Sequence, residues 1–349
     1  MRNEDRDAWT EPGTFEVAPG VHRIPLPLPG DGLRAINVYA LDDGDGITLV
    51  DCGWRHPKAV EALRAGLAAL GSDGRNVTRV IATHAHYDHY GLTAYLRDHA
   101  GCEIALGRDE VGMLAPAIDD GGWEAANDHR RAYMVRHGAS DLMAEIERQA
   151  EQEDYESVRG RGRWEMPDVL LDDGDVLAVG DRRLRAILTP GHTRGHMAFH
   201  DEANGLFFAG DHVLPHITPS LGFETWPDGR ALARFQAALL KVRDVPADLV
   251  LPGHGPVFDD LAERVDELLA HHEQRLARCV DIVADDGPDS ALDVARRLPW
   301  TRRDTPFVEL DVLNRLLAVG ETVTHLERLV DTGTLHRDEA ADVVLYAAA

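Results

Sequence analysis

The sequence predicts an α/β fold in which short apolar strands end in metal-binding types of side chain. Three strand-length apolar segments finish in turns that combine glycine with His or Asp, at residues 184–196, 207–212 and 249–256. Two other segments, residues 57–70 and 92–99, have the apolar spacing of helices. Alternating strands and helices of this kind favour sheets covered by helices, with a functional edge at the strand ends.

The N-terminal quarter of the chain predicts a short leader followed by antiparallel strands. Residues 1–20 are polar and rich in proline and glycine, and we expect them to form a leader outside the main fold. Residues 21–51 alternate apolar runs with turn sequences such as Pro29-Gly30-Asp31-Gly32, which is typical of antiparallel strands.

The segment HAHYDH at residues 84–89 is the strongest functional signal. It follows the apolar run at residues 80–83 and supplies three imidazoles and a carboxylate within six residues. His84 and His86 share one side of an extended segment, whereas Asp88 and His89 lie beyond a turn, where they can face a second ion. A solvated histidine cluster is the alternative, but such clusters rarely follow an apolar strand so closely.

Three later segments add potential ligands at other strand ends. They read TPGHTRGH at residues 189–196, FFAGDH at residues 207–212 and LPGHGP at residues 251–256. In this order, and together with the HAHYDH segment, they resemble the metallo-β-lactamase superfamily between about residues 21 and 257. The resemblance implies an αββα sandwich with a two-metal site along one edge.

The resemblance also assigns roles to individual residues. It implies that His84, His86 and His192 hold one metal ion. The second ion would be held by Asp88, His89 and His254, and Asp211 would bridge both ions. Asp51 matches an early acidic position of the family, so it would orient a ligand imidazole without binding metal. His196 would have a structural role or would support a ligand in the same way.

This ligand set predicts hydrolytic chemistry. Five imidazoles and two carboxylates suit two Zn²⁺ ions, although Fe or Mn is an alternative for a mixed nitrogen and oxygen site. Two neighbouring ions can share a water and turn it into hydroxide near neutral pH, and the hydroxide then attacks a carbonyl carbon or phosphorus. Asp88 and the bridging Asp211 are the expected catalytic carboxylates, and Asp88 would pass a proton to the leaving group.

Departures from known branches of the family narrow the substrate class. Family β-lactamases carry Cys or Ser where this chain has Asp211, and homoserine-lactone lactonases carry Tyr where it has Leu214. Glyoxalase II enzymes share the bridging Asp but use basic residues near the chain end that have no match here. We therefore expect hydrolysis of a thioester or related carbonyl ester, acyl-CoA-like or glutathione-like. A metal-dependent lactonase, an endoribonuclease and a non-catalytic binding protein are the alternatives.

Two regions extend the predicted catalytic domain of residues 21–260. Residues 109–165 form a charged, helical insertion that we expect to pack on the sandwich as a lid. Trp123 and Tyr133 of this insertion, with His212 and His216 beyond the bridging carboxylate, are candidates for the substrate pocket. Residues 261–349 predict three helices and a terminal hairpin, similar to the winged-helix tail of one branch of the superfamily. Packing on the catalytic domain or on a second subunit is favoured over DNA binding.

Composition restricts the partners and the compartment. The net charge of −25 disfavours nucleic acid, although the arginines of residues 159–163 leave room for a local basic groove. No apolar run approaches the roughly 18 residues of a membrane span, and the charged N-terminus does not look like a signal peptide. Three scattered cysteines fit a reducing compartment. We expect a cytoplasmic enzyme with a small-molecule substrate, no membrane association, and a homodimer as a further expectation.

Overall fold

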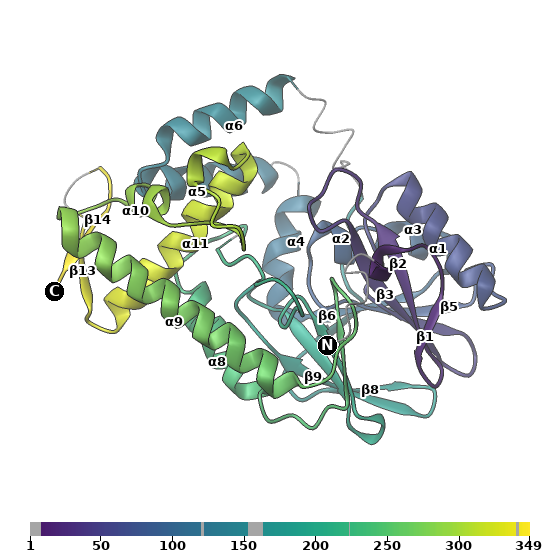
Figure 1. Cartoon of the computed structure of the whole chain (residues 1–349). Coiled ribbons are helices and arrows are strands. Elements are labelled where there is room, and N and C mark those ends of the chain that lie inside the picture. The colour runs from purple at the N-terminus through teal and green to yellow at the C-terminus, as the bar shows by residue number, and fades with distance from the viewer. Residues whose placement is uncertain (1–7, 120–121, 153–162, 223, 340–341) are drawn as a thin grey trace.

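Two β-sheets pack face to face between two layers of helices, and a further group of helices lies at one end (Figure 1). The computed structural model describes residues 8–119, 122–152, 163–222, 224–339 and 342–349. The mixed α/β class and the αββα arrangement are thereby confirmed. Residues 159–162 of the arginine-rich run lie outside the described residues, as do residues 1–7 of the expected leader.

The first sheet has seven strands in chain order. The first four strands run antiparallel, and β4 to β7 run parallel. The strands are β1 (Phe15–Ala18), β2 (Val21–Pro27), β3 (Ala35–Asp42), β4 (Ile47–Val50), β5 (Val77–Ile81), β6 (Glu103–Gly107) and β7 (Val169–Leu171). The antiparallel strands expected between residues 21 and 51 are present. β1 lies within the expected leader and pairs with β2, so this part of the leader belongs to the sheet.

The second sheet has five strands in the order β12-β11-β10-β9-β8. β11 and β12 are parallel, and the other neighbours are antiparallel. The strands are β8 (Val176–Val179), β9 (Arg182–Leu188), β10 (Met197–Asp201), β11 (Leu206–Gly210) and β12 (Leu249–Pro252). Each strand predicted to end in a ligand-bearing turn is therefore present.

The period of two along the strands divides the apolar side chains between two faces. In β3, Tyr39 and Leu41 join the core between the sheets, whereas Val38 and Ala40 face the helices on the outside. α1 (Pro57–Ala69) and α3 (Thr93–Ala100) cover the first sheet. α8 (Ala231–Val242) and the long α9 (Leu261–Asp286) pack against the outer face of the second sheet.

The insertion and the C-terminal segment together form one helical unit, which we define as α5, α6, α10, α11 and the β13–β14 hairpin. Their bounds are α5 (Gly122–Arg136), α6 (Ser140–Gln152), α10 (Ala291–Arg297), α11 (Val312–Asp331), β13 (Leu335–Asp338) and β14 (Leu345–Ala348). The expected helices and hairpin are confirmed. Shorter helices complete the chain: η1 (Ala8–Thr10), α2 (Tyr87–Tyr90), η2 (Arg108–Glu110), α4 (Val111–Ile118), η3 (Glu202–Asn204) and η4 (Phe307–Glu309).

The packing of the insertion agrees with the expectation only at its two ends. Leu114 of α4 and Trp164 pack in one apolar cluster with Leu106 of β6, so this part lies on the sandwich as expected. Between them, α6 packs against α11, and α5 reaches α10 and β14 (Figure 1). The amide of Leu292 donates to the carbonyl of His137 at 3.2 Å, and the amide of Val344 donates to the carbonyl of Arg136 at 2.8 Å. Within the described ranges, no helix has both the length and the apolar character that crossing a bilayer requires.

Candidate metal centre

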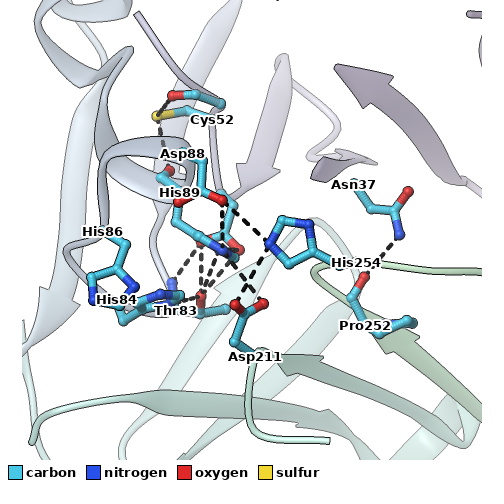
Figure 2. A network of polar contacts seen from close by, with 12 residues as sticks. Asn37, Cys52, Thr83, His84, His86, Asp88, His89, Asp211, Pro252 and His254 are labelled. Carbon is cyan, nitrogen blue, oxygen red and sulfur yellow. Dashed lines mark hydrogen bonds and ion pairs between the residues drawn. The ribbon is translucent and has the colours of Figure 1, made fainter. Parts of the chain in front are cut away.

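Loops that follow β5, β9, β11 and β12 meet at one edge of the sandwich. They carry all seven predicted ligands, although these come from four separate segments of the sequence. Figure 2 shows the side chains from the HAHYDH segment, Asp211 and His254 directed toward a common centre. Their donor atoms fall into overlapping groups within which all atoms lie within 4.8 Å of one another.

The first group consists of His84, His86 and His192. Nδ1 of His86 lies 3.0 Å from Nε2 of His192, and the two rings meet edge to face. All three imidazoles therefore face one point at the junction of the two sheets, with spacings that suit a single small cation.

The second group consists of Asp88, His89 and His254. Nε2 of His254 lies 3.3 Å from Oδ2 of Asp88, and Nε2 of His89 lies 3.7 Å from the same oxygen. Asp88 and His89 lie on the single-turn helix α2, and the ring of His89 lies 4.0 Å from that of His84, measured between centroids. The turn anticipated within the HAHYDH segment is this helix.

The carboxylate of Asp211 lies between the two groups. Its Oδ1 is 3.4 Å from Nε2 of His89, and its Oδ2 is 3.6 Å from Nε2 of His192 and 3.5 Å from Nε2 of His254. Each oxygen therefore faces imidazoles that converge on the site. This is the position that a carboxylate shared by two ions would take.

Several of the donor atoms at the centre are buried and lack hydrogen-bond partners among the described residues. This holds for Nε2 of His84, His89 and His254 and for Oδ1 of Asp211. Polar atoms buried without partners cost free energy, and several of them aimed at one point are typical of a metal site. Imidazole nitrogens and carboxylate oxygens also suit divalent transition metals, so the residues fit a pair of such ions.

Burial holds several of the ligands in the protonation state that binds metal. It is the largest influence on His84 and His86, whose pKa values it lowers, that of His86 to about 3 with the help of the neighbouring His192. For Asp88, burial raises the pKa, but His89 and His254 outweigh it and lower the pKa to about 2. Neutral imidazoles and charged carboxylates are the forms that coordinate metal.

His89 is the exception among the imidazoles. Burial lowers its pKa, but the carboxylates of Asp51, Asp211 and Asp88 together raise that pKa well above the usual value. A proton on His89 would balance these three carboxylates when no cation lies among them. A divalent ion would replace that proton and balance the same charges.

Asp51 orients the imidazole of His89. Its Oδ2 lies 2.8 Å from Nδ1 of His89, and its Oδ1 accepts the amide N–H of Thr83 at 2.8 Å. The hydroxyl of Thr83 lies 3.0 Å from Nδ1 of His84, so one small network orients both imidazoles. Asp51 has a φ of 59°, a left-handed conformation that costs free energy for a residue other than glycine and occurs mainly at functional sites.

His196 supports the bridging carboxylate through the backbone. Its Nε2 accepts the amide N–H of Asp211 at 3.1 Å, and its Nδ1 lies 2.7 Å from the hydroxyl of Thr189. Burial lowers the pKa of His196 well below the usual value, so the ring stays neutral and can accept through Nε2. The structure thus places His196 beside Asp211 without directing it at the centre.

Two of the predicted ligands are oriented by backbone carbonyls. The sequence did not indicate these carbonyls. Nδ1 of His254 donates to the carbonyl of Ala35 at 2.7 Å, and Nδ1 of His192 donates to the carbonyl of Ser220 at 2.8 Å. A proton on Nδ1 leaves the lone pair of Nε2 directed at the centre. Backbone acceptors carry no side-chain signal, so the sequence does not reveal them.

Asn37 and Tyr39 of β3 were also missed. The amide group of Asn37 donates to the carbonyl of Pro252 at 3.0 Å (Figure 2) and to that of Gly255 at 2.8 Å. The Tyr39 hydroxyl also donates to the carbonyl of Pro252, at 2.8 Å. These bonds anchor the loop that carries His254. Two polar side chains at alternate positions of an otherwise apolar strand were the available signal.

The four expected pocket residues do not form one cluster. Trp123 is 45% exposed on the first turn of α5, and His216 is half-buried in the loop after β11. Tyr133 packs on His137, with 4.6 Å between ring centroids, inside the helical unit. His212 differs most from the expectation because it is fully buried, with its ring 5.1 Å from that of Phe235. Their roles in substrate binding stay predictions.

The chain is similar to several proteins of known sequence. Over 288 residues it is 33% identical to a lactamase-like protein, nscB, of Neosartorya fischeri, and the match covers 81% of this chain and 67% of the fungal one. Over 275 residues it is 25% identical to a beta-lactamase-like protein 2 homolog of Caenorhabditis elegans, covering 78% of this chain and 74% of that one.

Solved structures and a family model point to the same family. A metallo-beta-lactamase family protein of Thermus thermophilus is 28% identical with a TM-score of 0.79, covering 96% of this chain and 100% of the other. A beta-lactamase domain protein of Burkholderia ambifaria is 28% identical with a TM-score of 0.76, covering 96% and 95%. The family model described as the metallo-beta-lactamase superfamily matches residues 31–254. The chain therefore belongs to the metallo-beta-lactamase superfamily.

Proposed function

We propose that this protein is a binuclear metal-dependent hydrolase of thioesters or related carbonyl esters, with two Zn²⁺ ions as its cofactors. The position of Asp211 supports the proposal, because its carboxylate lies between two groups of buried donor atoms. Two ions held there would lower the pKa of a shared water and stabilise negative charge on a substrate oxygen. Zinc is favoured because imidazoles form most of the ligand set.

The chain's own residues then bind, orient and move a proton. Asp88 would hydrogen-bond the attacking water and pass a proton from it to the leaving thiolate. Asp51, Thr83 and His196 hold the ligands and need not touch the substrate. The burial of Asp88 limits competing water around the reacting groups.

Two features support a thioester over the alternatives. The bridging residue is a carboxylate, where family β-lactamases have Cys or Ser. The position three residues later is Leu214, which is buried and offers only its carbonyl, bonded to Arg264 at 2.7 Å. It supplies no hydroxyl of the kind that homoserine-lactone lactonases use. The net charge of −25 supports a small-molecule substrate over RNA.

We also propose a cytoplasmic location for this enzyme. Cys52, Cys102 and Cys279 are all buried and unbridged, which suits a reducing compartment. A homodimer stays a prediction, and sedimentation of the purified protein would test it.

A thiol-release assay on the zinc-loaded protein tests the proposed substrate class. The panel contains acyl-CoA and acyl-glutathione thioesters of different acyl length, with Asp211→Ala as the inactive reference. Turnover that disappears in Asp211→Ala would support thioester hydrolysis. If protein that holds two equivalents of zinc hydrolyses no thioester of the panel, the proposal of a thioester substrate is rejected. Lactones and then RNA would be the next substrates to test.

A further inference from the structure

Glu110 is a buried carboxylate that lies between two of the ligand-bearing loops. It is the last residue of η2, which follows β6, and it directly precedes α4. Its side chain is fully buried. Neither the ligand set nor the resemblance to the family assigns it a role.

The two carboxylate oxygens of Glu110 each accept one backbone amide. Oε2 accepts the N–H of Ala85 at 2.7 Å, and Oε1 accepts the N–H of Gly195 at 2.8 Å. Ala85 lies between His84 and His86, and Gly195 lies in the loop that carries His192. A single side chain therefore joins the two loops whose imidazoles form the first ligand group.

Close backbone packing directs the carboxylate to this position. A Cβ atom on Gly195 would lie 2.4 Å from the amide nitrogen of Glu110, and one on Gly107 would lie 2.3 Å from the carbonyl oxygen of Gly195. Only glycine allows these approaches, because real Cβ atoms do not come so close to backbone. The end of β6 is thus pressed against the His192 loop, and the Glu110 side chain fills the remaining gap toward Ala85.

Keeping the Glu110 carboxylate ionised at this buried position costs free energy. Burial raises the pKa of Glu110 to about 7, and no Lys or Arg lies within ion-pair distance of it in the described part of the chain. The two backbone amide donors, of Ala85 and Gly195, are its local stabilisation. An apolar side chain could fill the space at lower cost, but it could not accept from both loops.

We infer that Glu110 is a positioning residue of the metal centre, which sets the separation of the His84–His86 loop from the His192 loop. It acts through Ala85 and Gly195 and touches neither metal nor substrate. This inference rests on the proposed two-metal site and is independent of the thioester substrate. Residues that orient metal ligands in this way commonly contribute about 10-fold to 100-fold to metal affinity.

The same residue links the insertion to the metal centre. α4 begins directly after Glu110, and its Gly112 carbonyl accepts the indole N–H of Trp226 at 3.3 Å. Trp226 belongs to the loop whose Ser220 carbonyl orients His192. The start of the insertion therefore contacts the segment that orients His192.

The test is the zinc affinity of Glu110→Gln, measured by competition with a chromogenic chelator. Glutamine has the same shape but only one acceptor oxygen, so its NH₂ group would face one of the two amide N–H groups. We expect one of the two zinc equivalents to bind about 10-fold to 100-fold more weakly. The absorption spectrum of the cobalt-substituted protein should change for the same equivalent. Glu321→Gln, which neutralises a half-buried acid of α11, is the matched control and should bind both equivalents normally.

The outcomes separate this inference from the proposed function. Two equivalents bound by Glu110→Gln with wild-type affinity and an unchanged cobalt spectrum would overturn the inference. Failure of the wild-type protein to bind two equivalents would instead reject the two-metal proposal. If circular dichroism shows that Glu110→Gln does not fold, Glu110→Asp replaces it. That side chain keeps the charge but is one methylene too short to reach both loops, so wild-type binding by it would equally overturn the inference.

Discussion

The metal centre and the helical unit are both buried, but opposite interactions stabilise them. At the metal centre, imidazoles and carboxylates converge, and several of their donor atoms have no hydrogen-bond partner among the described residues. In the helical unit, apolar side chains such as Leu142 and Leu326 share one large core. The comparison teaches that burial alone does not identify a functional site. Unsatisfied polar atoms directed at one point do.

The two regions should therefore respond differently to the same kinds of change. Loss of a ligand at the metal centre should remove metal and activity. Loss of a side chain in the helical unit should lower the free energy of unfolding and leave the metal in place. Apolar burial stabilises the helical unit, whereas bound ions would stabilise the arrangement of the side chains at the proposed metal centre.

The largest effect is expected for Asp211→Asn. Because this carboxylate faces both ligand groups, its loss should weaken both metals and lower kcat by more than ~100-fold. Metal content by elemental analysis and thiol release are the measurements. Asp201→Asn is the matched control, since Asp201 is buried on β10 and paired with Arg182 at 2.6 Å. It should lower stability only. Full turnover by Asp211→Asn would rule out a shared carboxylate.

Leu142→Ala should strongly destabilise the helical unit. Leu142 of α6 is 6% exposed, and truncating a buried leucine costs about 2–5 kcal/mol. Urea unfolding gives the change in the free energy of unfolding. Leu240→Ala on α8, where the side chain is 60% exposed, should cost about 0.5 kcal/mol or less. Both variants should retain two metal equivalents, and loss of metal from Leu142→Ala would show that the two regions are coupled.

Acid should destabilise the helical unit through His137. Burial lowers its pKa from 6.5 to about 4, so between these values the unfolded chain binds a proton that the folded chain does not. The free energy of unfolding therefore falls as pH falls through this window, by about 2 kcal/mol between about pH 7 and pH 5. His137→Asn should flatten this dependence, whereas substitution of the exposed His129 on α5, the helix that precedes His137, should not. An unchanged slope in His137→Asn would contradict the assignment.

The smallest effect is expected for the ion pair between α6 and α11. Arg315 and Glu145 are 2.7 Å apart with side chains 24% and 33% exposed, so solvent screens the pair. A double-mutant cycle with Arg315→Met and Glu145→Gln should give a coupling of about 1 kcal/mol or less. A coupling above about 2 kcal/mol would show that this contact, and not apolar packing, holds the insertion on the C-terminal segment.

The candidate metal ligands that the structure brings together could be named from the sequence because their signals are local. A strand that ends in HAHYDH, and three later strands that end in glycine beside His or Asp, identify the ligand loops without knowledge of the fold. The expected helices between residues 57 and 99 and beyond residue 261 were confirmed for the same reason, since apolar spacing is a local property.

The residues that hold the ligands could not be predicted in this way. Glu110 is a single acid in a charged stretch, and its role depends on two amides located 25 and 85 residues away in the sequence. The carbonyls of Ala35 and Ser220 carry no side-chain information. Such contacts exist only once strands from both sheets lie side by side.

The sequence by itself determined the ligand types, their loops and the amphipathic segments, because neighbouring residues specify strand ends and helix faces. The tertiary structure alone decided that Asp211 lies between the two ligand groups, that Glu110 joins two loops, and that α6 packs on α11. An apolar stripe specifies burial but not its partner, since hydrophobic association is non-directional. Which surfaces meet is decided by the packing of the whole chain.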